Sequence, residues 1–201
     1  MARVPLTKEQ VAPGRLVLNF GKVGLTEEQF FQLCSDNRDL RMELTAQKEL
    51  IIMAPTGLKS GWRENILSTE LTNWARKDGR GVVLNASAGY VLPNNAIRAP
   101  DASWVLRERL DVFSDAALEK FGHLSPDFAA EVISPSDIVA EVQDKMAEYI
   151  ANGVRLGWLI DPYEARVYIY RPGSVECLEN PTSISGDPVL PGFVFKVSEI
   201  W

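Results

Sequence analysis

The chain has 201 residues and is 46% hydrophobic, which is enough apolar material for one well-filled core. Its formal net charge of −6 excludes a uniformly basic surface that would hold nucleic acid by counterion release. A single histidine and two cysteines exclude a disulfide framework and a zinc site of the usual Cys/His kind.

The first residues lack the long apolar core and small-residue cleavage site of a secretion signal. No run approaches the roughly 18 apolar residues that span a bilayer. We therefore expect a cytoplasmic protein without a membrane segment. Residues 1–24 are expected to form a loosely ordered N-terminal extension, and residues 25–201 a single domain.

Hydrophobic periodicity predicts alternating helices and strands after this extension. In chain order these are a helix over residues 25–34 capped by Thr26, a hairpin of strands 42–44 and 50–53, a helix over 61–77 ended by Gly79, strands 82–84, 88–92 and 102–106, a polar helical excursion over 107–122, an apolar strand 128–133, a helix over 135–152, and strands 156–160 and 166–170. This order indicates an α/β or α+β fold in which helices flank a mixed central sheet.

One carboxylate interrupts the strongly apolar strand 128–133. Because side chains alternate between the two faces of a strand, Glu131 shares its face with Ala129 and Ile133. A buried charge without a partner is costly, so Glu131 must bind a cation, pair with an arginine or cap a neighbouring helix. Asp101 follows Pro100 at the start of another strand. Pro-Asp pairs are common at strand starts, so this pair alone is weak evidence for a functional site.

Lys145 belongs to the helix that follows Glu131. At 100° per residue it falls at the edge of the apolar stripe that contains Val142 and Met146, so its side chain points along the sheet. Its stem could simply cover apolar surface while the ammonium reaches water. Together with Asp101 and Glu131, however, it favours a divalent-metal site, and the oxygen ligands favour Mg²⁺ or Mn²⁺.

Basic side chains are unevenly distributed. Residues 1–100 carry 13 Lys+Arg against 10 Asp+Glu, whereas residues 101–201 carry 8 against 17. The basic residues of the first half could form a local edge that contacts nucleic acid. They could instead be an ordinary solvated helix face with loops. The members of this edge are Lys59, Arg63, Arg76, Lys77, Arg80 and Arg98.

Four stretches together resemble one protein family. They are IRAPDASWV (97–105), PDFAAEVISPSD (126–137), DKMAEYIANGVRLGWLIDP (144–162) and LPGFVFKVSEIW (190–201). These resemble the Uma2 family, also called DUF820, a family of proposed restriction endonucleases whose fold is similar to the PD-(D/E)XK nucleases. The likeness extends from about Thr26 to Trp201 and implies a restriction-endonuclease-like mixed central sheet flanked by helices.

The resemblance implies roles for particular residues. In PD-(D/E)XK nucleases a lysine usually follows the acid by two positions, where this chain has Ile133; the resemblance places the lysine at Lys145 instead. Asp101, Glu131 and the carbonyl of Val132 are then expected to bind Mg²⁺ or Mn²⁺. Lys145 is expected to orient the attacking water or to stabilise charge on the phosphate.

An additional site acid is also implied. Glu43 lies in MELTAQKEL (42–50), which resembles a YELIDGEL segment of Uma2 members, and we prefer it as a catalytic residue. Related folds place a glutamate on the first long helix, where Glu64 stands. Both could instead be ordinary surface acids.

The expected function is that of a metal-dependent endonuclease that hydrolyses DNA phosphodiesters, acting as a homodimer because two-fold pairs are the commonest soluble assembly and can cut both strands. The alternative is a catalytically weak or inactive module on the same scaffold that binds nucleic acid or another partner. One scaffold can host both activities, so the fold alone does not separate them.

Overall fold

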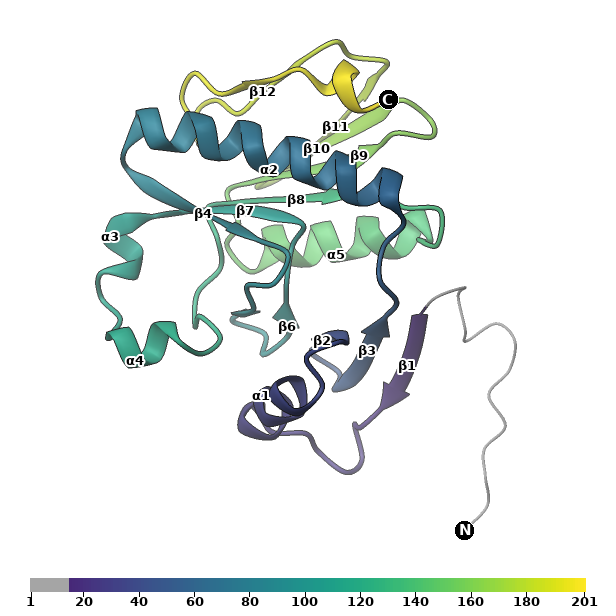
Figure 1. The fold of residues 1–201 in the computed structure, drawn as a ribbon, viewed down its shortest axis with the longest axis vertical. Helices are drawn as coiled ribbons and strands as arrows, with labels where there is room; N and C mark the ends of the chain where they lie inside the picture. Colours follow the sequence, from purple (N-terminus) through teal and green to yellow (C-terminus); the bar gives the residue numbers. More distant parts are fainter. Residues whose placement is uncertain (1–14) are drawn as a thin grey trace.

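The computed structural model describes residues 15–201, whose arrangement is shown in Figure 1. Its helices are α1 (Glu27–Asp36), α2 (Leu58–Asp78), α3 (Arg107–Leu110), α4 (Asp115–Leu118), α5 (Val139–Ala151) and the 3₁₀ helix η2 (Val197–Ile200). Its strands are β1 (Arg15–Asn19), β2 (Arg41–Leu44), β3 (Glu49–Met53), β4 (Gly81–Asn85), β5 (Tyr90–Val91), β6 (Ile97–Arg98), β7 (Ala102–Leu106), β8 (Phe128–Val132), β9 (Leu156–Asp161), β10 (Arg166–Arg171), β11 (Ser174–Glu179), β12 (Ile184–Ser185) and β13 (Val194–Phe195).

Six strands form the central sheet in the order β11-β10-β9-β8-β7-β4. The pair β8 and β9 is parallel and the other neighbours are antiparallel, so the sheet is mixed. The fold class expected from the sequence, a mixed central sheet flanked by helices, is confirmed.

The two long helices cover opposite faces of this sheet, as Figure 1 shows. On one face Leu67 of α2 packs in the same buried cluster as Trp104. On the other face Met146 of α5 packs with Ala129. The predicted alternation of β8 is therefore correct, and it directs Glu131 toward the α5 side.

A second sheet of five strands, in the order β1-β3-β2-β6-β5, lies below the central sheet in Figure 1. Helix α1 packs against it through Phe30, and the expected cap is present because the Thr26 hydroxyl accepts from Gln29 N at 3.2 Å. The chain passes from β6 to β7 through residues 99–101. This crossing places Asp101 where the two sheets meet.

The N-terminal extension expected over residues 1–24 divides into two parts. Residues 1–14 lie outside the described part of the chain. Residues 15–19, in contrast, form β1, which pairs with β3 in the smaller sheet. Among the helices between residues 15 and 201, none combines the length and apolarity needed to cross a membrane.

Candidate active site

Two neighbouring strands bring Asp101 and Glu131 together. In the antiparallel β7–β8 pair, Ala102 lies opposite Ala130. Extending this register by one residue places Asp101 opposite Glu131, and directly opposed side chains on one face are close neighbours. Both residues are only 6% exposed. Two carboxylates thus share a recessed position at the junction of the sheets.

Asp101 is held by groups from both sheets. Its Oδ2 accepts a hydrogen bond from Val132 N at 2.9 Å, and its Oδ1 accepts from Arg41 Nη2 at 2.9 Å. The same Arg41 nitrogen donates to the carbonyl of Ala99 at 3.1 Å. Arg41 therefore fixes the chain crossing as well as the carboxylate.

Lys145 lies between two carboxylates. Its Nζ is 2.8 Å from Glu131 Oε1 and 2.8 Å from Glu43 Oε1. The side chain is 14% exposed, so its ammonium is largely removed from water. The helical spacing correctly predicted that Lys145 points toward the sheet, and the ammonium does not reach out into solvent. Because Glu131 and Glu43 outweigh the effect of burial, the pKa of Lys145 is raised and the group stays cationic.

Both carboxylate oxygens of Glu43 accept hydrogen bonds. Its Oε1 also accepts from Ala99 N at 3.1 Å, and its Oε2 accepts from Arg98 Nη1 at 3.1 Å. Burial by itself would raise the pKa of Glu43, but Lys145 and Arg98 lower it to about 2. Glu43 is therefore an ionised carboxylate held by Lys145, Arg98 and the Ala99 amide.

Glu131 has a different environment. Its Oε1 accepts from Lys145 and from the Tyr149 hydroxyl at 3.1 Å, and within residues 15–201 no hydrogen bond reaches its Oε2. Burial raises its pKa, and the charges of Asp101 and Glu43 add to this against the opposing effect of Lys145, so the pKa is about 8. Glu131 thus holds a proton more tightly than an ordinary carboxyl group does, even with Lys145 beside it.

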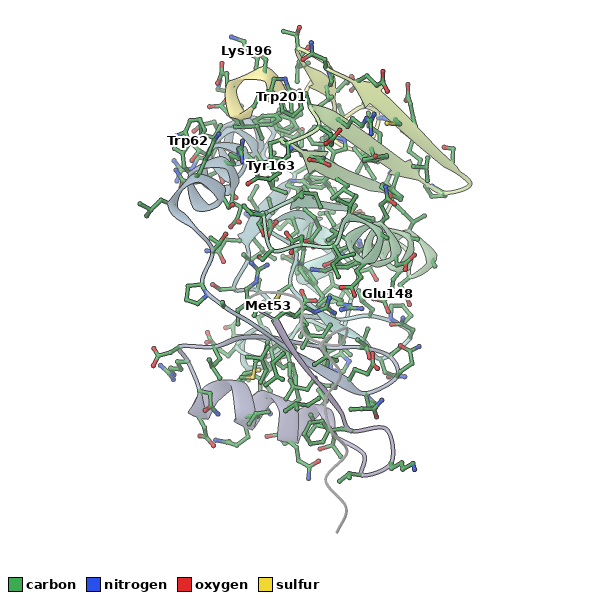
Figure 2. The ribbon with its side chains drawn as sticks, turned by 90° about the vertical axis from the view of Figure 1, so that its right-hand side faces the viewer. Met53, Trp62, Glu148, Tyr163, Lys196 and Trp201 are labelled. Carbon is green, nitrogen blue, oxygen red and sulfur yellow. The ribbon has the colours of Figure 1, made fainter. Side chains whose placement is uncertain are left out.

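These side chains open into a pocket of about 690 Å³ between the smaller sheet and α5. Figure 2 shows Met53, which lines it, at the level where the lower part of the molecule meets the upper layers. Its charged lining consists of Arg15, Arg41, Lys59, Arg98 and Lys145 with Glu43, Glu64, Asp101, Glu131, Asp137 and Glu141. Five cations and six anions give a formal charge of −1, which one divalent cation would change to +1.

Comparison with known proteins shows the family. The family described as "Uma2: Putative restriction endonuclease" matches residues 27–198. The chain belongs to the Uma2 family. A crystal structure of "a putative nuclease belonging to DUF820" from Anabaena variabilis ATCC 29413 is similar in fold, with a TM-score of 0.70 at 18% sequence identity over 79% of this chain and 88% of that chain. No curated protein matches the chain.

The resemblance that the sequence indicated is therefore confirmed, while the roles of individual Uma2 residues stay predictions. The structure brings Asp101, Glu131 and Lys145 into one pocket, whereas Ile133 belongs to the apolar cluster on the α5 side of the sheet and does not line the pocket. It also brings in Glu43, which contacts Lys145 directly.

Glu64 is the other acid that the sequence left open. It lies on α2, is partly buried and lines the same pocket. Burial is the main cause that raises its pKa to about 7, and the nearby Asp101 adds to it. Of the two candidate acids, Glu43 accepts hydrogen bonds through both of its oxygens. Glu64 lines the pocket, and its pKa of about 7 lets it gain or lose a proton near neutral pH.

Two of the six residues of the expected basic edge are buried. Arg63 and Arg98 are 1% and 8% exposed. Arg98 pairs with Glu43 and with Glu148, whereas Arg63 donates from Nε to the Ile200 carbonyl at 2.7 Å and lies over the Tyr163 ring. The basic edge is therefore wrong as a six-residue surface.

The donor set fits a divalent cation of the Mg²⁺ type. In the described part of the chain no three Asp, Glu, His or Cys side chains gather closely enough to hold an ion alone. Mg²⁺ is commonly bound by one or two carboxylates and keeps several waters, so Asp101 and Glu131 with the Val132 carbonyl match its needs. The Oε2 of Glu131, which accepts no hydrogen bond within residues 15–201, is open to such an ion.

Proposed function

We propose that this Uma2 protein is a metal-dependent endonuclease that hydrolyses phosphodiester bonds of DNA. The observation that supports this best is the placement of Asp101 and Glu131 on adjacent strands, with the Lys145 ammonium in contact with Glu131. Membership of a family described as restriction endonucleases supports the same conclusion. Asp101, Glu131 and the carbonyl of Val132 would hold Mg²⁺ or Mn²⁺.

A cation held there would supply Lewis acidity, which would polarise the phosphate and lower the pKa of a water molecule. The protein's own contribution begins with position. Asp101 is fixed by Arg41 and by the Val132 amide, so its carboxylate needs no rearrangement to accept a ligand. Preorganised groups of this kind stabilise charge without a reorganisation cost at the moment of reaction.

Lys145 would act as a cation and not as a base, because the raised pKa keeps its ammonium protonated. A phosphate that enters the pocket offers this ammonium additional oxygens to bind. Lys145 would then stabilise the negative charge that develops on the phosphoryl oxygens, or orient the attacking water.

Glu43 and Glu64 would have separate roles. Glu43 is a positioning residue, since it holds Lys145, Arg98 and the Ala99 amide, and its low pKa makes it a poor proton acceptor near neutral pH. Glu64 would accept a proton from the attacking water, because a general base works best with a pKa near the working pH. The preference for Glu43 as a directly reacting acid is thereby replaced by a proposal in favour of Glu64.

Cleavage of supercoiled plasmid tests the proposal. We expect nicking that requires Mg²⁺ or Mn²⁺ and that falls by about 10³-fold in Asp101→Asn and Lys145→Ala proteins. Asp144→Asn is the matched control, because Asp144 is an exposed acid next to Lys145 on α5 and lies outside the pocket lining. Cleavage that continues unchanged in both pocket variants would reject the assignment.

A binding module without catalysis is the second candidate. It is favoured by the position of Lys145, whose ammonium is already held by two carboxylates. A thermal-shift titration separates the two, because a ligand that binds only the native state raises its apparent stability. No stabilisation at millimolar Mg²⁺ or Mn²⁺ would favour the binding module.

We also propose that two copies pair, so that two pockets can meet the two strands of one duplex. Analytical ultracentrifugation should then give twice the 22.4 kDa of one chain. A single species at the mass of one chain, at the concentrations used for cleavage, would remove this part of the proposal.

A further inference from the structure

A second hollow, of about 640 Å³, adjoins the pocket described above. Glu64 and Asp101 line both of them. The two hollows therefore meet at the carboxylates where the scissile phosphate is proposed to bind. We call the second hollow the α2 groove; it lies between one face of α2 and the segment Asn85–Ser87 at the end of β4.

The sequence of α2 explains why this groove is polar. Asn65, Ser68, Thr72 and Arg76 recur at intervals of three or four residues, so they share one face of the helix. The adjacent face carries Leu67, Leu71 and Ala75, which are buried against the central sheet. The two periodic patterns direct amide and hydroxyl groups into the groove and apolar groups into the core.

The opposite side of the groove offers groups of the same kind. Asn85 and Ser87 both line it, and the Asn85 side chain accepts a hydrogen bond from Ser87 N at 3.0 Å, which fixes the local turn. A solvated helix face usually carries many charged side chains in pairs. Between Gly61 and Arg76, however, the groove contains a single charged side chain from α2, Glu64.

Arg76 is the last residue of α2 that lines the groove, at the end far from Glu64. It is exposed, and within residues 15–201 it forms no ion pair. Twelve residues separate it from Glu64, which corresponds to about 18 Å along the helix axis. Successive phosphates of a B-form strand rise ~3.4 Å along the duplex axis, so this distance corresponds to about five nucleotides of a duplex whose axis runs along α2.

We infer that the α2 groove binds the nucleic-acid strand that continues from the scissile phosphate, with Arg76 on a phosphate about five nucleotides away. Amides and hydroxyls contact sugar and phosphate oxygens along the way, which positions the strand without reading its sequence. This inference rests on the proposed function, because it uses the same carboxylates as the point where the strand is cut.

Fluorescence anisotropy with labelled oligonucleotides of 4 and 14 nucleotides tests the groove, in EDTA so that no metal-dependent cleavage occurs. Arg76→Ala should weaken binding of the 14-nucleotide strand and of its duplex by roughly three- to tenfold, and lower the dependence of log K on log salt by about one phosphate contact. Binding of the 4-nucleotide strand should change less than twofold. Thr72→Tyr, which fills the groove, should also weaken binding of the longer strand.

Lys77→Ala is the matched control, because it removes the same charge from the next residue of α2, which is exposed and lies outside both hollows. It should leave binding unchanged. Equal effects of Arg76→Ala and Lys77→Ala, no effect of either, or no measurable binding of the 14-nucleotide strand would overturn the inference.

A separate assay distinguishes a failure of the groove from a failure of the proposed function. Bis(4-nitrophenyl) phosphate is a phosphodiester too small to reach Arg76, so its metal-dependent hydrolysis reports on the pocket alone. Hydrolysis together with groove-independent DNA binding overturns only the groove. Groove-dependent binding without hydrolysis of either substrate supports the groove and overturns the endonuclease.

Discussion

Glu43 of the smaller sheet and Glu131 of the central sheet lie on either side of one ammonium group, yet their proton affinities differ greatly. Both are almost completely buried and both are 2.8 Å from Lys145. Glu43 additionally binds Arg98 and a backbone amide, whereas Glu131 has Asp101 as a neighbour. The pKa is about 2 for Glu43 and about 8 for Glu131. Because both carboxyl groups are buried, the further donors to Glu43 and the neighbouring charge of Asp101 at Glu131 account for the difference in pKa.

The largest expected effect is the loss of catalysis in Glu131→Gln. The amide keeps the shape of the side chain but removes the negative charge that would hold the cation, so cleavage should fall by about 10³-fold. Because the pKa of about 8 leaves Glu131 mostly protonated at neutral pH in the metal-free protein, the neutral amide should keep its stability close to that of the unsubstituted protein. Initial rates of plasmid cleavage and urea unfolding measure the two effects. If Glu131→Gln loses stability, or cleaves at a rate within tenfold of the unsubstituted protein, the contrast between Glu131 and Glu43 is wrong.

Glu43→Gln should behave in the opposite way. It leaves Arg98 and Lys145 with a neutral neighbour in a buried position, and breaking a buried ion pair typically costs about 3 kcal/mol or more. We expect a fall of about that size in the free energy of unfolding, followed by urea denaturation at neutral pH. Glu70→Gln, an exposed change on α2, is the control and should alter stability by less than about 0.5 kcal/mol. Equal stabilities of the two variants would show that Glu43 does not hold the site together.

The raised pKa of Glu131 predicts how cation affinity changes with pH. Its folded pKa of about 8 lies above the ordinary value of 4.5, so the folded metal-free protein takes up a proton. This contribution to stability is complete below about pH 4.5 and is lost as the pH rises through 8, with a smaller part from Glu64 lost through about 7. A cation must displace the proton, so Mg²⁺ affinity should rise by up to about tenfold per pH unit and level off above 8.

Isothermal titration calorimetry at pH 6, 7, 8 and 9, in buffers of different ionisation enthalpy, measures both the affinity and the protons released. About one proton should leave per cation at pH 7. Affinity that stays constant over this range would mean that Glu131 is already ionised or does not bind the ion.

Local sequence signals predicted most of the central sheet and the direction of the reactive groups. The alternation in β8 placed Glu131 on the α5 side, and helical spacing placed Lys145 toward the sheet. Short or exposed strands were missed. The two residues of β6 are too few to show a period, and β11 is exposed along almost its whole length. The last long helix begins at Val139 and not at 135, because Ser134 N donates to Asp137 Oδ2 in a turn that precedes it.

The partners of the site could not be predicted in the same way, because they come from the register of the smaller sheet. Glu43 and Arg98 are 55 residues apart, and they meet only because Leu44 pairs with Ile97. Trp62 shares helical spacing with Ile66, which is typical of a buried position, yet Trp62 is 48% exposed and the neighbouring Arg63 is buried instead. The physical reason is that the Ile200 carbonyl and the Tyr163 ring give the guanidinium of Arg63 partners inside the molecule.

The smallest expected effect concerns Tyr149, whose hydroxyl is a further difference between the surroundings of Glu131 and Glu43. Its hydroxyl donates to Glu131 Oε1 at 3.1 Å and makes no hydrogen bond to Glu43 within residues 15–201. Tyr149→Phe should reduce the free energy of unfolding by about 1 kcal/mol, as expected for one hydrogen bond, because the ring still fills the core. Losing a donor to the ionised form raises the pKa of Glu131 further, so the rise of Mg²⁺ affinity with pH should move to higher pH. The same calorimetric titration measures this shift, and an unchanged profile would show that the hydroxyl does not influence the proton on Glu131.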